Sequence, residues 1–175
     1  VHPPGAPLFL MLGRLFSLLT PDGAKDAYFM NLISAFSTAG VVMFAFWITT
    51  GLAKRLIVKA NEEIPLDKTI AILGAGLVAA LACTFMDTLW FSAVEGEVYA
   101  LSTFFMFVVL WGIMKWESCA DESQANRWLV FISYMIGVSI GVHLLSLLVI
   151  PVAVLIYYLK KFKPTLIGTI ISLVV

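Results

Sequence analysis

The sequence predicts an all-α, polytopic transmembrane protein, and two observations support this class. Hydrophobic residues make up 61% of the 175 residues and charged residues 13%, a balance typical of membrane proteins. Apolar runs long enough to cross a bilayer recur along the chain between short polar segments. A net charge of zero argues against a nucleic-acid partner, which needs a surplus of basic side chains on one face. The lipid bilayer is therefore the first expected partner.

Residues 1–26 are expected to form a loop that carries an interfacial helix. Consecutive prolines in His2-Pro3-Pro4-Gly5-Ala6-Pro7 exclude a helix there, because proline removes donors and pushes the preceding residue towards extended geometry. The apolar run from Leu8 to Leu19 would rise only about 18 Å as a helix, against a hydrocarbon core of roughly 30 Å. Since the sequence starts at Val1 rather than Met and stops inside an apolar run, we expect a fragment lacking the first span.

Six apolar segments are predicted to span the membrane, the last of them only in part. The first has a surface of small residues suited to close helix packing. The run from Trp128 to Leu159 would be about 48 Å long as one helix, so we expect a hairpin that turns near His143. Within one transmembrane domain covering residues 1–175, the expected spans are 27–53, 69–86, 98–114, 128–142, 144–159 and 164–175.

Basic residues predict how these spans are oriented. The positive-inside rule places the loop from Lys54 to Lys68 in the cytoplasm, because four of its residues are basic. The polar loop from Lys115 to Arg127 and the lysines after Leu159 are expected on the same side. An acidic corner from Asp87 to Glu97, the leader 1–26 and His143 would then lie on the extracytoplasmic side.

The acidic corner is the first candidate for function. It places Glu95, Gly96 and Glu97 between two apolar runs, with Asp87 just upstream and no Lys or Arg between Thr69 and Met114. An ionisable side chain in or beside lipid is costly, so its presence indicates a functional site. Glu95 and Glu97 would point to nearly opposite sides of a continuous helix, whereas a break at Gly96 would allow them to converge.

Five short segments of the chain form a recognisable set: His2-Pro3-Pro4-Gly5-Ala6-Pro7-Leu8, Leu12-Gly13-Arg14-Leu15-Phe16, Asn31-Leu32-Ile33-Ser34-Ala35, Ala93-Val94-Glu95-Gly96-Glu97-Val98-Tyr99-Ala100-Leu101 and Gly137-Val138-Ser139-Ile140-Gly141-Val142-His143. In this order they resemble the membrane family related to protein O-mannosyltransferases, much of which is bacterial. The likeness covers nearly the whole chain. Ala6 departs from it, standing where many relatives have an aromatic residue.

This resemblance implies a GT-C-like fold and a glycosyltransferase. Such an enzyme moves a sugar, with mannose as one candidate, from a polyprenyl-phosphate carrier to a protein Ser or Thr hydroxyl at the extracytoplasmic face. The lipid-linked donor and an acceptor protein are therefore the implied partners, in a multi-pass protein of the bacterial inner membrane. The family's main catalytic acid is expected upstream of Val1, so the fragment alone is expected to be inactive.

Transfer to a hydroxyl needs a carboxylate to take the proton and groups that hold the carrier phosphate. Glu97, Glu95 and Asp87 are the catalytic candidates in this sequence. In the alternative, Glu97 only stabilises the positive end of the helix that starts at Val98. Asp87 is expected at the C-terminal end of its helix, where the dipole disfavours an anion, and solvation in a loop would also explain it.

Four further residues are candidates for substrate binding. Arg14 could clamp a phosphate or snorkel to the headgroups, and Tyr99 could stack on a sugar or anchor at the interface. His2 and His143 could bind a phosphate or an acceptor hydroxyl. No close ligand spacing supports a metal site of His2, His143 and a Glu, so no metal or other cofactor is predicted, and a divalent ion stays an open alternative.

Two other functions compete with the transferase. A transporter or flippase could use the acidic residues as ion or headgroup sites, although transporters usually place such residues near the bilayer midplane and show internal repeats. A non-catalytic assembly subunit is the third hypothesis. Cys83, in an apolar run, and Cys119, in a charged segment, indicate neither a disulfide framework nor a metal site.

Overall fold

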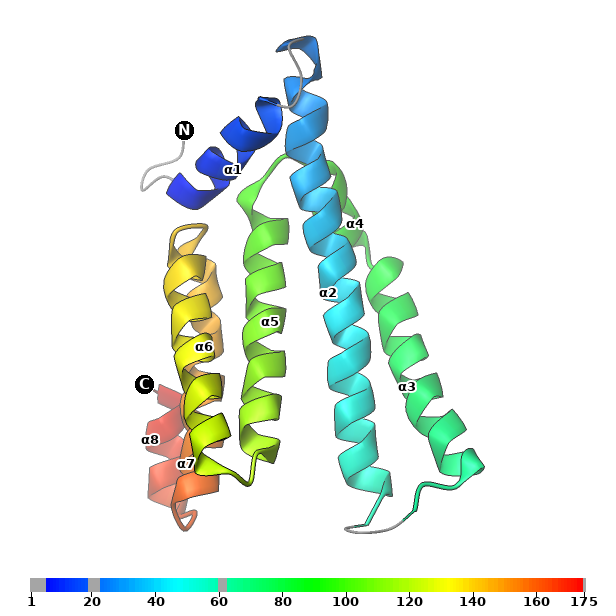
Figure 1. Ribbon diagram of the computed structural model, residues 1–175, viewed down its shortest axis with the longest axis vertical. Helices are drawn as coiled ribbons and strands as arrows, with labels where there is room; N and C mark the ends of the chain where they lie inside the picture. The colour runs from blue at the N-terminus through cyan, green and yellow to red at the C-terminus, as the bar shows by residue number, and fades with distance from the viewer. Residues whose placement is uncertain (1–5, 19–22, 60–62, 175) are drawn as a thin grey trace.

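The computed structural model describes residues 6–18, 23–59 and 63–174, which form helices without any strand (Figure 1). Four helical stretches are long and apolar enough to cross a membrane: α2, α3, α5 and the continuous stretch Leu144–Lys161. The predicted all-α, polytopic class is confirmed. The elements in order are α1 (Pro7–Ser17), η1 (Gly23–Lys25), α2 (Asp26–Ile57), α3 (Leu66–Thr84), α4 (Asp87–Val94), α5 (Val98–Ser118), α6 (Glu122–Ile140), η2 (Leu144–Leu148), α7 (Val149–Lys161) and α8 (Leu166–Val174).

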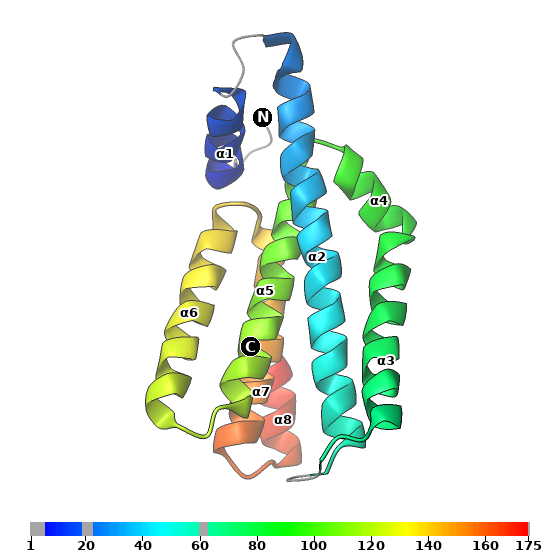
Figure 2. The same cartoon turned by 45° about the vertical axis from the view of Figure 1, so that its right-hand side comes forward.

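The long helices run side by side between two ends of the bundle (Figure 1, Figure 2), and the charged residues at the two ends differ. We call the end that carries α1, α4, the connection 95–97 and the turn 141–143 the acidic end. The opposite end carries the α2–α3, α5–α6 and α7–α8 connections, and we call it the basic end. Its basic side chains are Lys54, Arg55, Lys59, Lys68, Lys115, Lys160, Lys161 and Lys163.

At the acidic end, α1 lies across the tops of the long helices and joins them. A buried cluster links Phe9 of α1 with Ile33 of α2, Leu101 of α5 and Val142 in the turn after α6. The Leu8 N–H also donates to the Gly141 carbonyl at 2.9 Å. In lipid, such contacts stabilise through close packing and hydrogen bonding rather than through removal from water. Helix α1 therefore fixes how α2, α5 and the turn meet.

Towards the basic end, α5, α6 and α7 pack around a second buried cluster. Val109, Ile113 and Trp116 of α5 meet Ile132 of α6 and Val149 of α7 in this cluster.

The side chain of Lys160 closes the basic end of α5. Its ammonium donates to the carbonyls of Trp116 and Cys119 at 2.7 and 3.1 Å, and lies 4.5 Å from the centroid of a Trp116 ring. The last carbonyls of a helix have no partner inside that helix. Lys160 supplies a hydrogen-bond donor to these carbonyls, and its positive charge is favourable at the negative end of the helix dipole.

Two sequence predictions about these connections are wrong. The polar loop expected over residues 115–127 is mostly helical, because α5 continues to Ser118 and α6 begins at Glu122, where the Asp121 carboxylate accepts from the Gln124 N–H at 3.0 Å. The span expected over about 69–86 corresponds to α3, which ends at Thr84, so Asp87 does not end that span but begins a separate helix, α4. Helix α6 is not among the four stretches above, because its first half is rich in polar residues: Glu122, Ser123, Gln124, Asn126 and Arg127.

The chain turns between α6 and η2, at residues 141–143. Helix α6 ends at Ile140, and η2 begins at Leu144 and leads directly into α7. Figure 1 shows this turn beneath α1, at the acidic end. His143 therefore lies at the same end as the connection 95–97.

Two glycines of α3 provide a test of helix packing. A Cβ at Gly76 would overlap the Thr50 methyl and lie 2.9 Å from the Phe46 ring, whereas a Cβ at Gly74 would meet nothing within 4 Å. We expect Gly76→Leu to destabilise the protein by about 1–3 kcal/mol through overpacking, and Gly74→Leu to leave stability nearly unchanged. Unfolding in a detergent titration measures both variants. Equal stability of the two would contradict the α2–α3 packing described.

Candidate active site

Glu95 and Glu97 flank a break between two helices at the acidic end. Glu95 follows the last residue of α4 and Glu97 precedes the first residue of α5, both with extended backbone and exposed side chains. The Glu97 N–H donates to the Glu95 carbonyl at 2.9 Å, which makes the break tight. The carboxylates thus leave the backbone on either side of Gly96, outside any regular helix.

Helix α2 supports this break from behind. A Cβ at Gly96 would lie 3.0 Å from the Asn31 amide oxygen, so the missing side chain allows the break to approach α2 closely. The Ser34 hydroxyl, fully buried on α2, donates to the Glu97 carbonyl at 3.5 Å. Asn31 and Ser34 lie on one face of α2, three residues apart. Neither residue was predicted to have a role at the site, although their spacing at the predicted outer end of the span places both on one helix face.

The Glu97 carboxylate is exposed and makes no capping hydrogen bond to the N–H groups of α5. Its position at the N-terminus of α5 still places it in the favourable field of the helix dipole. Dipole stabilisation therefore accounts for a negative charge at this position, while the carboxylate oxygens remain accessible to a ligand.

Asp87 occupies a different position from the one predicted. It is the first residue of α4, not the last residue of a span, so the expectation that a helix dipole disfavours its charge is wrong. At a helix N-terminus an anion is stabilising. Helix α4 separates Asp87 from Glu95 by about 12 Å along its axis. The structure does not bring Asp87 into the group formed by Glu95 and Glu97.

Tyr99 and His143 meet at the acidic end although they are far apart in sequence. Their ring centroids are 5.5 Å apart, with the planes tilted by 54°. The His143 Nδ1 accepts from the Leu145 N–H at 3.0 Å, and its carbonyl accepts from the Ser146 hydroxyl at 2.8 Å. Because Nδ1 is the acceptor, the proton of the neutral ring is assigned to Nε2. Nε2 can therefore donate to a bound group.

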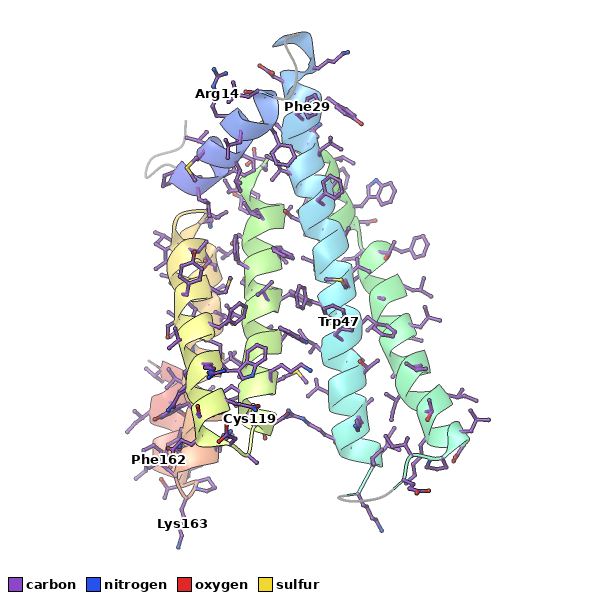
Figure 3. The ribbon with its side chains drawn as sticks, in the orientation of Figure 1. Arg14, Phe29, Trp47, Cys119, Phe162 and Lys163 are labelled. Carbon is purple, nitrogen blue, oxygen red and sulfur yellow. The ribbon has the colours of Figure 1, made fainter. Side chains whose placement is uncertain are left out.

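The remaining predicted residues lie apart from this pair. Arg14 is exposed on α1 and points away from the bundle (Figure 3), with its guanidinium 3.4 Å from the Ser17 hydroxyl. His2 lies outside the described residues. Among the described residues, no three His, Cys, Asp or Glu side chains gather in a way that could hold a metal ion. The acidic end therefore offers carboxylates, an imidazole and a phenol.

The fold and this site together define a class: a polytopic helical membrane protein with two exposed carboxylates at a helix break and an aromatic–imidazole pair at the same end of the bundle. A family model described as "Protein O-mannosyl-transferase TMEM260 N-terminal domain" matches residues 1–166, and the chain belongs to this family.

A curated relative agrees with the family assignment. "Protein O-mannosyl-transferase tmem260" of Dictyostelium discoideum is 24% identical over 169 residues, which cover 87% of this chain. The same alignment covers 18% of the relative, so the chain spans less than a fifth of that protein's length. No solved structure matches this chain.

Substitutions at His143 separate its structural contact from its availability to a ligand. His143→Ala removes the acceptor for the Leu145 N–H, and we expect a loss of about 0.5–2 kcal/mol, as for a lost helix cap. His143→Asn keeps a short side-chain acceptor and should retain most of that stability. Thermal unfolding in detergent measures both. Equal destabilisation by the two variants would show that the ring contact with Tyr99, not the cap, holds the turn.

Proposed function

We propose that this chain forms part of a GT-C type glycosyltransferase that acts at the extracytoplasmic face of the membrane. The enzyme would move a sugar, with mannose as the candidate, from a polyprenyl-phosphate carrier to a Ser or Thr hydroxyl of a protein. Membership of the O-mannosyltransferase family supports the transferase class. The observation that carries the proposal is the pair of exposed carboxylates at the helix break, at the same end of the bundle as the Tyr99–His143 pair.

The proposed reaction transfers the sugar to an acceptor oxygen. The acceptor hydroxyl attacks the anomeric carbon, the bond from that carbon to the carrier phosphate breaks, and the hydroxyl proton passes to a carboxylate. We assign Glu97 to proton acceptance and Glu95 to stabilising the positive charge that develops on the sugar ring. Their placement on either side of Gly96 suits both roles, because the substrate could approach the two carboxylates from one side.

The departing phosphate needs hydrogen-bond donors or positively charged groups as partners. The His143 Nε2 is available as a donor, since Nδ1 is already bonded to the Leu145 N–H. Tyr99 lies against the same ring and offers a face for the sugar. Arg14 is assigned to the carrier headgroup, because α1 lies at the membrane interface in this orientation. His2 keeps its predicted substrate-binding role in the proposal. We leave Asp87 outside the site because α4 separates it from Glu95.

The position of the acidic residues favours a transferase over a transporter. Asp87, Glu95 and Glu97 lie at one end of the spans and not at the mid-depth of α2, α3 or α5. Transport sites usually lie near the bilayer midplane. A carboxylate at the end of the bundle can instead reach a donor whose phosphate lies among the headgroups and an acceptor that arrives from water. The positive-inside rule orients the basic end towards the cytoplasm.

A single substitution in the full-length protein tests this proposal. Glu97→Gln keeps the size of the side chain and removes its charge, and we expect sugar transfer to an acceptor peptide to fall by a factor of about 100 or more. The assay measures glycosyl product formed from a polyprenyl-phosphate sugar, with membrane insertion checked in parallel. Glu63→Gln, an exposed glutamate at the basic end, is the matched control and should transfer normally. Wild-type transfer by Glu97→Gln would remove Glu97 from the mechanism.

A further inference from the structure

A groove opens at the basic end of the bundle, far from the candidate active site. Helices α2 and α5 lie close at the acidic end and diverge towards the basic end in both views (Figure 1, Figure 2). Residues of α2, α5, the α2–α3 connection and the start of α3 line a groove of about 910 Å³ there. This volume is within the range of sites for small organic ligands, about 300–1,000 Å³.

The deeper part of the groove is apolar and aromatic. The Trp47 and Trp111 rings lie 6.0 Å apart with their planes tilted by 36°, and Ile72 and Met114 continue the same lining. Gly51 contributes no side chain, and a Cβ there would lie 2.9 Å from the end of Met114. Tryptophan is enriched where a membrane protein crosses from hydrocarbon to headgroups. The lining therefore suits an acyl chain next to an interfacial headgroup.

The mouth of the groove is positively charged. Its lining includes four basic side chains and no acidic one: Lys54, Arg55, Lys59 and Lys115. The Arg55 guanidinium is already engaged, since it contacts the Glu117 carboxylate at 2.5 Å and donates to the Met114 carbonyl and the Ser118 hydroxyl at 3.0 and 2.6 Å. These bonds join α2 to α5 across the groove and offset the arginine's charge.

The charge that remains for a ligand comes chiefly from two lysines on facing helices. Lys54 is exposed on α2, and Lys115 is exposed on α5 with its ammonium 5.4 Å from the centroid of a Trp111 ring. A lysine can extend its charge to the headgroup level while its stem lies along an apolar surface. Lys54 and Lys115 therefore line the groove from facing helices, together with the aromatic rings of Trp47 and Trp111.

We propose that this groove binds one anionic phospholipid from the leaflet at the basic end. Its phosphate would lie between Lys54 and Lys115, and its acyl chain would run along Trp47, Trp111 and Ile72 in the space that opens between α2 and α5. Basic pockets between membrane helices are suited to anionic headgroups. A free phosphate would leave the apolar floor uncovered, and a zwitterionic lipid would leave the lysines without a net charge to pair with. The inference depends neither on the proposed transferase activity nor on which side the basic end faces.

Tryptophan fluorescence of the full-length protein in nanodiscs tests the proposal. The nanodiscs consist of unbrominated phosphatidylcholine with a small amount of either phosphatidylglycerol or phosphatidylcholine whose acyl chains are brominated. The quenching of Trp47 (Figure 3) is the difference in quenching between the wild type and Trp47→Phe. Each lysine near a headgroup favours an anionic lipid by about fivefold. We expect brominated phosphatidylglycerol to quench Trp47 at a mole fraction at least several-fold lower than brominated phosphatidylcholine.

Substitutions of charged residues test whether the preference for anionic lipid comes from Lys54 and Lys115. Lys54→Gln with Lys115→Gln should bring the two quenching curves together, whereas the charge-keeping pair Lys54→Arg with Lys115→Arg should keep them apart. The matched control is Lys161→Gln with Lys163→Gln, which removes the same charge at the same end but outside the groove. Three results would overturn the proposal: equal quenching by both lipids in the wild type, an equal loss of preference in the control, or no quenching of Trp47 by either lipid.

Discussion

The contact between α2 and α5 is the constraint on which the rest of the structure depends. At the acidic end the two helices meet closely, since a Cβ at Gly40 would lie 2.5 Å from the Phe104 ring and the Ser34 hydroxyl reaches the Glu97 carbonyl. Further along, Phe44 packs edge-on against Trp111 with centroids 5.5 Å apart. Only at the basic end does a long side chain, Arg55, bridge them.

The changing distance between α2 and α5, which are close at one end and apart at the other, accounts for both candidate sites. Close approach at the acidic end presses the helix break at Gly96 against α2 and fixes where Glu95 and Glu97 emerge. Divergence at the other end opens the groove beneath Trp47 and Trp111. Small residues on α2 permit the close approach at the acidic end. Bulky aromatic residues hold the two helices apart towards the basic end. The two ends therefore differ in shape as well as in charge.

The apolar runs were sufficient to predict the helical class and the acidic corner, because hydropathy reports which segments avoid water. They could not predict that α5 and α6 continue into residues 115–127, since Lys, Glu, Gln and Ala favour a helix in water as well as in lipid. Nor could they predict α4. Neither Pro nor Gly marks the break at Phe85 and Met86, and Asp87 was therefore placed at the wrong end of a helix.

The contacts of the candidate site were harder to predict than its residues. Glu95, Glu97, Tyr99 and His143 were all named from the sequence, but the pairing of Tyr99 with His143 depends on the α6–η2 turn lying beside the start of α5. Helix α1 contributes to that placement, because its Leu8 N–H donates to the Gly141 carbonyl. Tertiary contacts between distant segments leave no periodic signal in one sequence, so only the structure could supply them.

The proposed site requires that the acidic end face away from the cytoplasm and that the basic end face into it. Single cysteines at Thr88 and at Glu63, both exposed, placed in a full-length background without native cysteines, test it directly. A membrane-impermeant maleimide added to intact cells should label Thr88→Cys and leave Glu63→Cys unlabelled until the membrane is opened. Labelling of Glu63→Cys alone in intact cells would reverse the orientation and contradict the proposed extracytoplasmic site.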